Sequence, residues 1–386
     1  MTERKRRRSL FGQPLPGRAL LVQLKRDALR FLRGIMTADG RKKLRKVLAS
    51  QHGGVRGVYQ RLNTRAVHEA MRRADSSAAL LTAAQQLAQD DPLRLEASRH
   101  YLRAGNEAAA EELVRDLLAA RAKKLPPSLA DGLRSLREAP EFPLAAAALD
   151  WSWRNLATGI SDRTQWERQL RFAAASSQLL WDWLYCAPDR SGELDALIDP
   201  PAPALRDRLQ RQNRGLLLIA SHIGAPVAGI HHLCRSDLPV KLLGREPKTD
   251  ALCNTDYLID SENPYSLRDV RRALDRGSSV IVAAEAGRGR NQLEVAFPGN
   301  ATLLVRGWIP RLLWRERIGS LFLFPIWQNG RIRISLTDDA PQPDDDETYP
   351  AWEQRWLHAY RDKLLAVMQS EPENLNLRTV FWRQFR

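Results

Sequence analysis

The sequence has little cysteine and no long uncharged apolar run. Its 386 residues include three cysteines, Cys186, Cys234 and Cys253, and no CxxC motif. Three cysteines cannot build a disulfide scaffold, which is typical of a reducing compartment. Outside residues 215–234, which include histidines, no stretch of about 20 apolar residues could span a bilayer. The basic start lacks the apolar core of a secretory signal. These absences argue against a secreted mini-protein and a transmembrane protein.

Acidic residues are scarce at the N-terminal end. Residues 1–50 contain 15 Lys or Arg and 3 Asp or Glu, whereas the whole chain has a formal net charge of +15. Apolar residues at three- and four-residue spacing predict a basic amphipathic helix over residues 18–36. This helix either lies on an anionic bilayer surface or packs on the protein's own core. We do not expect nucleic acid as a partner, because no aromatic residues are interleaved with the basic ones.

Tryptophan is absent from the first 150 residues, and all 11 tryptophans follow them. Residues 51–149 are instead rich in Ala, Leu and Arg, and they are expected to be helical. A helical hairpin over residues 91–120, which turns at Gly105-Asn106, resembles one tetratricopeptide-like unit. We therefore predict a basic N-terminal segment at residues 1–50, a helical region at 51–149 and a different domain at 150–386.

In the C-terminal domain, strand and helix patterns alternate. Strands are predicted at residues 215–220, 239–243, 279–284, 321–328 and 331–337. The last two flank Asn329-Gly330, a strong two-residue hairpin signal. Helices are predicted at residues 166–185, at 267–276 before Gly277, and at 351–368, where an aromatic stripe is typical of a core. This order predicts an α/β domain with a mixed, mostly parallel sheet flanked by helices.

Residues that can carry chemistry follow three of the predicted strands. His222 comes directly after the first strand, and Pro226 has the place of the first residue in the next helix. Arg245 follows the second strand, and Glu285 follows the third. Parallel strands would bring these side chains to one edge of the sheet, where α/β proteins place their sites. There His222 is either a general base or a buried structural histidine.

A glycine-rich stretch comes after Glu285. Gly287, Arg288 and Arg290 suit an anionic group, through guanidinium bonds and main-chain N–H groups. The stretch matches neither a Walker A nor a Rossmann fingerprint. It therefore predicts a substrate-binding loop without naming the substrate.

Six short blocks occur in a recognisable order. They are Ser221-His222-Ile-Gly224, Gly244-Arg245-Glu-Pro247, Glu285-Ala-Gly287-Arg288, Ala296-Phe-Pro-Gly299-Asn-Ala-Thr302, Leu323-Phe-Pro325-Ile and the end from Glu371-Pro-Glu-Asn to Phe385-Arg386. Through them, residues 150–386 resemble the bacterial lipid A late acyltransferase (lauroyl/myristoyl transferase) branch of the lysophospholipid acyltransferase superfamily. The resemblance implies His222 as general base and Glu285 as a second catalytic residue. It also implies Arg245, Gly287, Arg288 and Arg290 as substrate-binding residues.

One position departs from the pattern of that family. Its His-x4-Asp/Glu acid falls on Val227 in this sequence, although the family's carboxylate orients the imidazole. Glu285 or Asp260, from another strand, is a candidate substitute. If no carboxylate substitutes, the chain is a binding or scaffold protein that keeps the fold without the chemistry. His231 and His232 are expected to be structural.

The resemblance also implies a reaction. A fatty acyl group would pass directly from a thioester of acyl carrier protein or coenzyme A to a hydroxyl or amine of an amphipathic acceptor, such as a lipid A precursor or lysolipid. Main-chain N–H groups at the helix start after His222 are candidate oxyanion donors. No metal and no further cofactor are expected. We expect the basic segment to hold the protein peripherally at the cytoplasmic face of the bacterial inner membrane, in place of a transmembrane helix.

Overall fold

The computed structural model describes residues 107–244, 257–261, 263–285, 291–337 and 340–377. The chain divides into two compact units. The first comprises Met1–Ala120 and Pro247–Cys253, and the second comprises Arg121–Glu246 and Asn254–Arg386. Helix α6 (Glu107–Ala122) agrees with the helix predicted for the second half of the hairpin. The basic segment and the remainder of the predicted hairpin lie outside the described residues.

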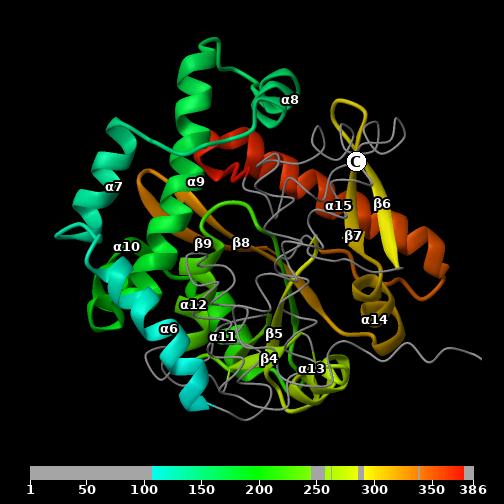
Figure 1. Ribbon diagram of the computed structural model, residues 1–386. Coiled ribbons are helices and arrows are strands. Elements are labelled where there is room, and N and C mark those ends of the chain that lie inside the picture. The colour runs from blue at the N-terminus through cyan, green and yellow to red at the C-terminus, as the bar shows by residue number, and fades with distance from the viewer. Residues whose placement is uncertain (1–106, 245–256, 262, 286–290, 338–339, 378–386) are drawn as a thin grey trace, which may run out of the picture. The chain divides into compact units, whose positions relative to one another are not determined.

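A seven-stranded sheet forms the centre of the second unit (Figure 1). Its strands, in spatial order, are β1 (Ile198–Asp199), β9 (Arg331–Thr337), β8 (Ser320–Gln328), β2 (Leu217–Ala220), β5 (Ser279–Ala283), β3 (Val240–Gly244) and β4 (Leu258–Asp260). Neighbours pair in parallel, except for the antiparallel pair β8 and β9. The predicted α/β fold with a mixed, mostly parallel sheet is therefore confirmed.

The β8–β9 hairpin forms where the sequence predicts it. Asn329 and Gly330 both have positive φ, at 51° and 78°, as a two-residue turn between right-twisted strands requires. Strand β8 is mostly buried, whereas β9 alternates between exposed arginines and buried aliphatic side chains. Both faces of β8 are therefore covered, and it lies beside β2 in the middle of the sheet.

Nine α-helices of the second unit surround or flank this sheet. They are α7 (Leu129–Glu138), α8 (Ala146–Leu156), α9 (Arg163–Cys186), α10 (Ser191–Leu197), α11 (Pro203–Arg211), α12 (Pro226–Arg235), α13 (Ser266–Asp275), α14 (Trp308–Glu316) and α15 (Tyr349–Ser370), among the described residues. Short-range interactions and backbone conformation fix the start of α7 and the end of α13. The Ser128 side chain accepts the Asp131 N–H at the start of α7, and Gly277 takes φ 82° after α13, both common helix boundaries.

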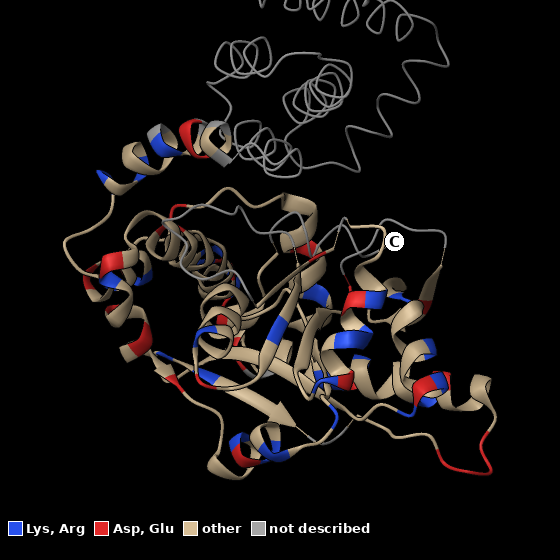
Figure 2. Cartoon of the chain, turned by 90° about the horizontal axis from the view of Figure 1, so that it is seen from below, with Lys and Arg blue, Asp and Glu red and all other residues tan. Residues whose placement is uncertain are grey.

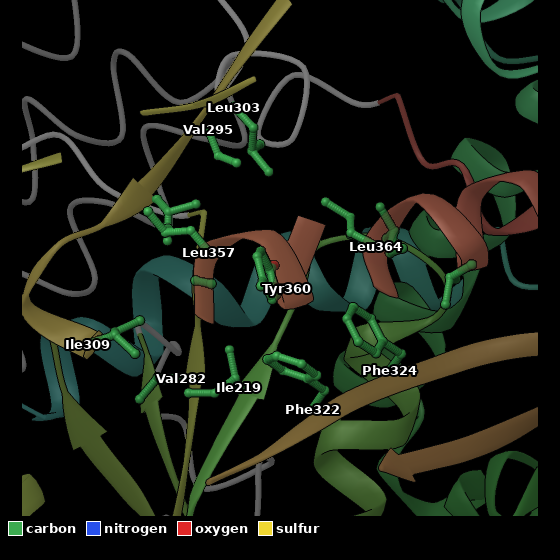
Figure 3. Close-up of a cluster of buried hydrophobic side chains, with 14 of the residues drawn as sticks. Ile219, Val282, Val295, Leu303, Ile309, Phe322, Phe324, Leu357, Tyr360 and Leu364 are labelled. Atoms are coloured by element: carbon green, nitrogen blue, oxygen red, sulfur yellow. The ribbon is translucent and has the colours of Figure 1, made fainter. Parts of the chain in front are cut away.

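A hydrophobic cluster joins the sheet to α15 and to a separate two-stranded sheet (Figure 3). That sheet pairs β6 (Gln292–Phe297) with β7 (Ala301–Arg306), and neither strand is among those predicted. Its turn contains Gly299 and Asn300, both with positive φ. The predicted aromatic stripe of α15 is buried as expected, and the rings of Trp356 and Tyr360 stack 5.8 Å apart.

Basic and acidic residues are interspersed over the described helices (Figure 2). Many of them form pairs, as where Arg355 binds Asp344 at 2.9 Å and Glu347 at 2.6 Å. The charge excess of residues 1–50 lies outside the described part of the chain. Among the helices that the structure describes, none combines the length and apolar character that crossing a bilayer needs.

Candidate functional site

The sheet brings His222 and Glu285 together. Strands β2 and β5 are parallel neighbours, with Ala220 opposite Ala283, so the residues that follow them emerge at the same edge. His222 Nδ1 lies 3.4 Å from Glu285 Oε2. The Glu285 side chain is fully buried, whereas 28% of the His222 side chain is exposed. The Glu285 carboxylate is therefore shielded from solvent, whereas the His222 imidazole is accessible to it.

This geometry suits His222 to act as a base. An imidazole that donates its Nδ1–H to a carboxylate carries its lone pair on Nε2. The carboxylate orients the ring and stabilises the imidazolium that forms when Nε2 takes up a proton. Because the ring is partly exposed, a proton donor outside the protein interior has access to it. The arrangement can therefore remove a proton from a hydroxyl or amine.

Two further hydroxyls lie at Glu285. The Ser221 hydroxyl donates a hydrogen bond to Glu285 Oε1. The hydroxyl of Tyr360, from α15, is buried and has no hydrogen bond of ordinary geometry within the described part of the chain. Burial raises the pKa of Tyr360 well above that of an ordinary phenol, and the negative charge of Glu285 adds to the increase. Sequence periodicity had assigned Tyr360 to the core, and nothing local indicated where its hydroxyl would lie.

The turn after β2 is held by its own main chain. Gly224 has φ 68°, and a Cβ there would lie 2.2 Å from the carbonyl oxygen of Pro325. The Gly224 N–H donates to Asn374 O at 2.7 Å, and the Ala225 N–H donates to Pro325 O at 2.8 Å. The Ile223 N–H donates to the Ser221 hydroxyl. These three N–H groups already donate hydrogen bonds, and Pro226 has no N–H group. The oxyanion donors predicted at the helix start after His222 are therefore main-chain N–H groups from Val227 onward.

Asn374 fastens this turn to strand β8. Its side chain is fully buried and forms two bonds with the Trp327 main chain. Oδ1 accepts the Trp327 N–H at 2.6 Å, and Nδ2 donates to the Trp327 carbonyl at 3.1 Å. The side chain thus acts as an extra strand partner for β8. Two of the blocks noted in the sequence, around Pro325 and Asn374, meet at the turn that carries His222.

Other carboxylate candidates are less well placed. Val227 is half-buried in the first turn of α12 and brings no acid. Asp260 ends β4, which is separated from β2 by β3 and β5. Glu285 follows the strand next to β2, and it is therefore the candidate acid that the structure places at His222. The predicted substrate-binding residues Arg245, Gly287, Arg288 and Arg290 lie outside the described residues.

His231, His232 and Cys186 have structural surroundings. His231 is buried, with the hydroxyls of Tyr185 and Tyr257 each 3.0 Å from one of its ring nitrogens. His232 Nδ1 lies 2.9 Å from Asp195 Oδ1. Burial, with the negative charge of Asp182, raises the pKa of the Cys186 thiol to about 12, which makes it a poor nucleophile at neutral pH. Within the described ranges, no cluster of His, Cys, Asp or Glu suits a metal ion.

Comparison with known proteins gives a distant similarity. No protein-family model matches this chain. The Vi polysaccharide export protein VexE of Salmonella typhi is 29% identical to it over 296 residues, which cover 74% of this chain and 44% of that protein. The chain therefore matches less than half of the length of that relative. It is similar to part of a protein whose name refers to polysaccharide export.

Proposed function

We propose that this chain transfers a fatty acyl group from the thioester of acyl carrier protein or coenzyme A to a hydroxyl or amine of an amphipathic acceptor. The proposal places it with the lipid A late acyltransferase branch that its motif order resembles. The observation that carries the proposal is the contact between His222 Nδ1 and Glu285 Oε2 at 3.4 Å. This contact gives His222 an orienting carboxylate, although the position at which the family motif carries that acid is Val227 in this sequence.

The proposed reaction needs one proton relay. His222 Nε2 takes the proton of the acceptor group as its oxygen or nitrogen attacks the thioester carbonyl. The tetrahedral intermediate then collapses, the carbon–sulfur bond breaks, and the thiolate takes the proton back from the imidazolium. Glu285 stabilises that imidazolium without taking part in bond formation. The products are an ester or amide and the free thiol of the carrier, so no acyl-enzyme forms.

The acceptor is proposed from the name of the VexE relative, and the location is proposed from the positive charge of residues 1–50. Because the relative is named for polysaccharide export, saccharide-bearing lipids should be tested first, with lysolipids second. We place the protein peripherally at the cytoplasmic face of the bacterial inner membrane, held by the basic segment. Deletion of residues 1–36 should release the chain from anionic vesicles, and undiminished sedimentation with them would refute this attachment.

The experiment offers acyl carrier protein and coenzyme A thioesters to the purified full chain with each acceptor, and detects acylated products by mass spectrometry. His222→Ala should abolish transfer. Glu285→Gln should lower kcat by about 10²- to 10⁴-fold, because the imidazole loses its orienting charge. His232→Ala is the matched control, since it removes a histidine that also contacts a carboxylate, Asp195, but lies outside the site. It should leave the rate unchanged.

The alternative is a binding or scaffold protein, favoured by Val227 at the motif position. In that case no thioester is consumed with any acceptor, and His222→Ala changes nothing but local stability. Turnover that survives in His222→Ala would also reject the proposed base. Transfer that is lost in His222→Ala and retained in His232→Ala supports the enzyme.

A further inference from the structure

We propose that Ser221 is a positioning residue, whose hydroxyl holds the Glu285 carboxylate in the orientation that His222 needs. This inference rests on the proposed function and deepens it, because it gives a role to a buried hydroxyl that the reaction itself does not use. The observation behind it is a shared carboxylate. The Ser221 hydroxyl donates to Glu285 Oε1, and His222 Nδ1 lies 3.4 Å from Oε2. Two consecutive residues of one turn therefore engage the two oxygens of the same group.

The Glu285 side chain needs an anchor besides the imidazole. The motif acid would follow the histidine closely on the next helix, but that position is Val227 in this sequence. The carboxylate comes instead from the end of the neighbouring strand β5, on a long and flexible side chain. Fixing such a side chain in one conformation has an entropic cost, and a single nitrogen at 3.4 Å is a weak restraint. A hydrogen bond to the other oxygen limits rotation of the carboxylate.

The main chain next to Glu285 is already fixed. The Ala284 N–H donates to Ala220 O at 3.0 Å, and the Ala284 carbonyl accepts the Arg306 N–H at 2.9 Å. The residue before Glu285 is thus tied both to β2 and to β7. The freedom that remains lies in the Glu285 side chain, which is the part that Ser221 contacts.

The Ser221 hydroxyl is arranged as a donor to Glu285 and not as a nucleophile. It is buried, and its oxygen accepts the Ile223 N–H at 3.3 Å. A hydroxyl has a single proton, and this one is directed to Glu285 Oε1. A serine nucleophile would instead give its proton to the imidazole. An ionised carboxylate only accepts hydrogen bonds, and bonds to it are stronger than bonds between neutral groups.

The test compares Ser221→Ala with the full wild-type chain in kcat, KM and the ¹⁵N spectrum of the His222 ring. We expect kcat to fall about 10- to 100-fold at unchanged KM, the effect of losing one hydrogen bond to a charged group. The ring spectrum should move from the Nδ1–H tautomer toward a mixture, since a carboxylate that can rotate no longer fixes the proton on Nδ1. Ser221→Thr keeps the hydroxyl and should restore both properties.

A double-mutant cycle shows whether Ser221 acts through Glu285. In a chain that carries Glu285→Gln, Ser221→Ala should lower kcat little further, because the charge that Ser221 positions is already gone. A full, additive loss of kcat in that background would overturn the inference. If Ser221→Ala does not fold, Ser221→Cys takes its place with the same expected direction, since a thiol is only a weak donor.

Ser152→Ala is the matched control. Ser152 is also buried, and its hydroxyl likewise donates one bond, to Leu149 O, and accepts one, from Trp166 Nε1. The substitution should lower the urea midpoint about as much as Ser221→Ala does. It should leave kcat and the His222 spectrum unchanged, because this serine lies outside the site.

Two further results would overturn the inference. One is a wild-type kcat and ring spectrum in Ser221→Ala, and the other is a loss of kcat that Ser152→Ala reproduces. The ring spectrum also separates the inference from failure of the proposed function. A chain that transfers no acyl group, but whose His222 tautomer balance shifts in Ser221→Ala, retains the positioning role.

Discussion

Replacement of Asn374 by alanine should destabilise the second unit strongly. The side chain makes two bonds with the Trp327 main chain, at 2.6 and 3.1 Å, and both residues are almost wholly buried. Asn374→Ala leaves one N–H and one carbonyl of Trp327 unpaired. An unpaired buried group costs about 1–3 kcal/mol, so the two together predict a loss of about 2–6 kcal/mol in the free energy of unfolding.

Urea unfolding followed by circular dichroism measures this loss. Asn374→Asp should be at least as damaging, because it keeps the acceptor for the Trp327 N–H but turns a second oxygen toward the Trp327 carbonyl. Gln328→Ala is the control, since this neighbour on β8 binds Arg333 in an exposed position. It should change the free energy by less than about 0.5 kcal/mol. If Asn374→Ala unfolds with wild-type stability, the side chain does not extend β8 as described.

Three further predictions concern packing and ionisation. Gly229→Ala should destabilise by about 1–3 kcal/mol in the same assay, since its Cβ would lie 2.3 Å from Pro325 Cβ, whereas Gly192→Ala enters open space and should be nearly neutral. With Cys234 and Cys253 replaced by serine, Cys186 should react with a thiol reagent at pH 8 far more slowly when folded than in urea, because its pKa is about 12; equal rates would contradict this. Burial and Glu373 raise the pKa of Glu371, so its contribution to stability is present at acid pH and is lost as pH rises through the folded-state value. Glu371→Gln should therefore be as stable as the wild type near pH 3 and more stable at pH 7. Equal urea midpoints of the two proteins at pH 7 would contradict a raised pKa of Glu371.

Local patterns in the sequence predicted five of the seven strands of the large sheet, namely β2, β3, β5, β8 and β9, and the helices α9, α12, α13 and α15. The Asn329-Gly330 turn, Gly277 after α13 and Pro226 at the start of α12 lie where local pattern placed them. These features are predictable because turn geometry, capping and hydrophobic periodicity depend on residues close together in the chain. The strands β1, β4, β6 and β7 escaped prediction. β1 and β4 are only two and three residues long, and β6 and β7 form a small separate sheet with a weak alternating pattern.

The tertiary structure alone decided which residues meet. From the sequence, both Glu285 and Asp260 were candidates to replace the acid missing at Val227, and the motif order favoured Glu285. Strand order separates them, because β5 lies next to β2 whereas β4 lies at the sheet edge. The contact of the Asn374 side chain with the Trp327 main chain is also non-local. Such contacts depend on strand order and helix docking, which arise from packing of the whole core and leave no signal in a local stretch of sequence.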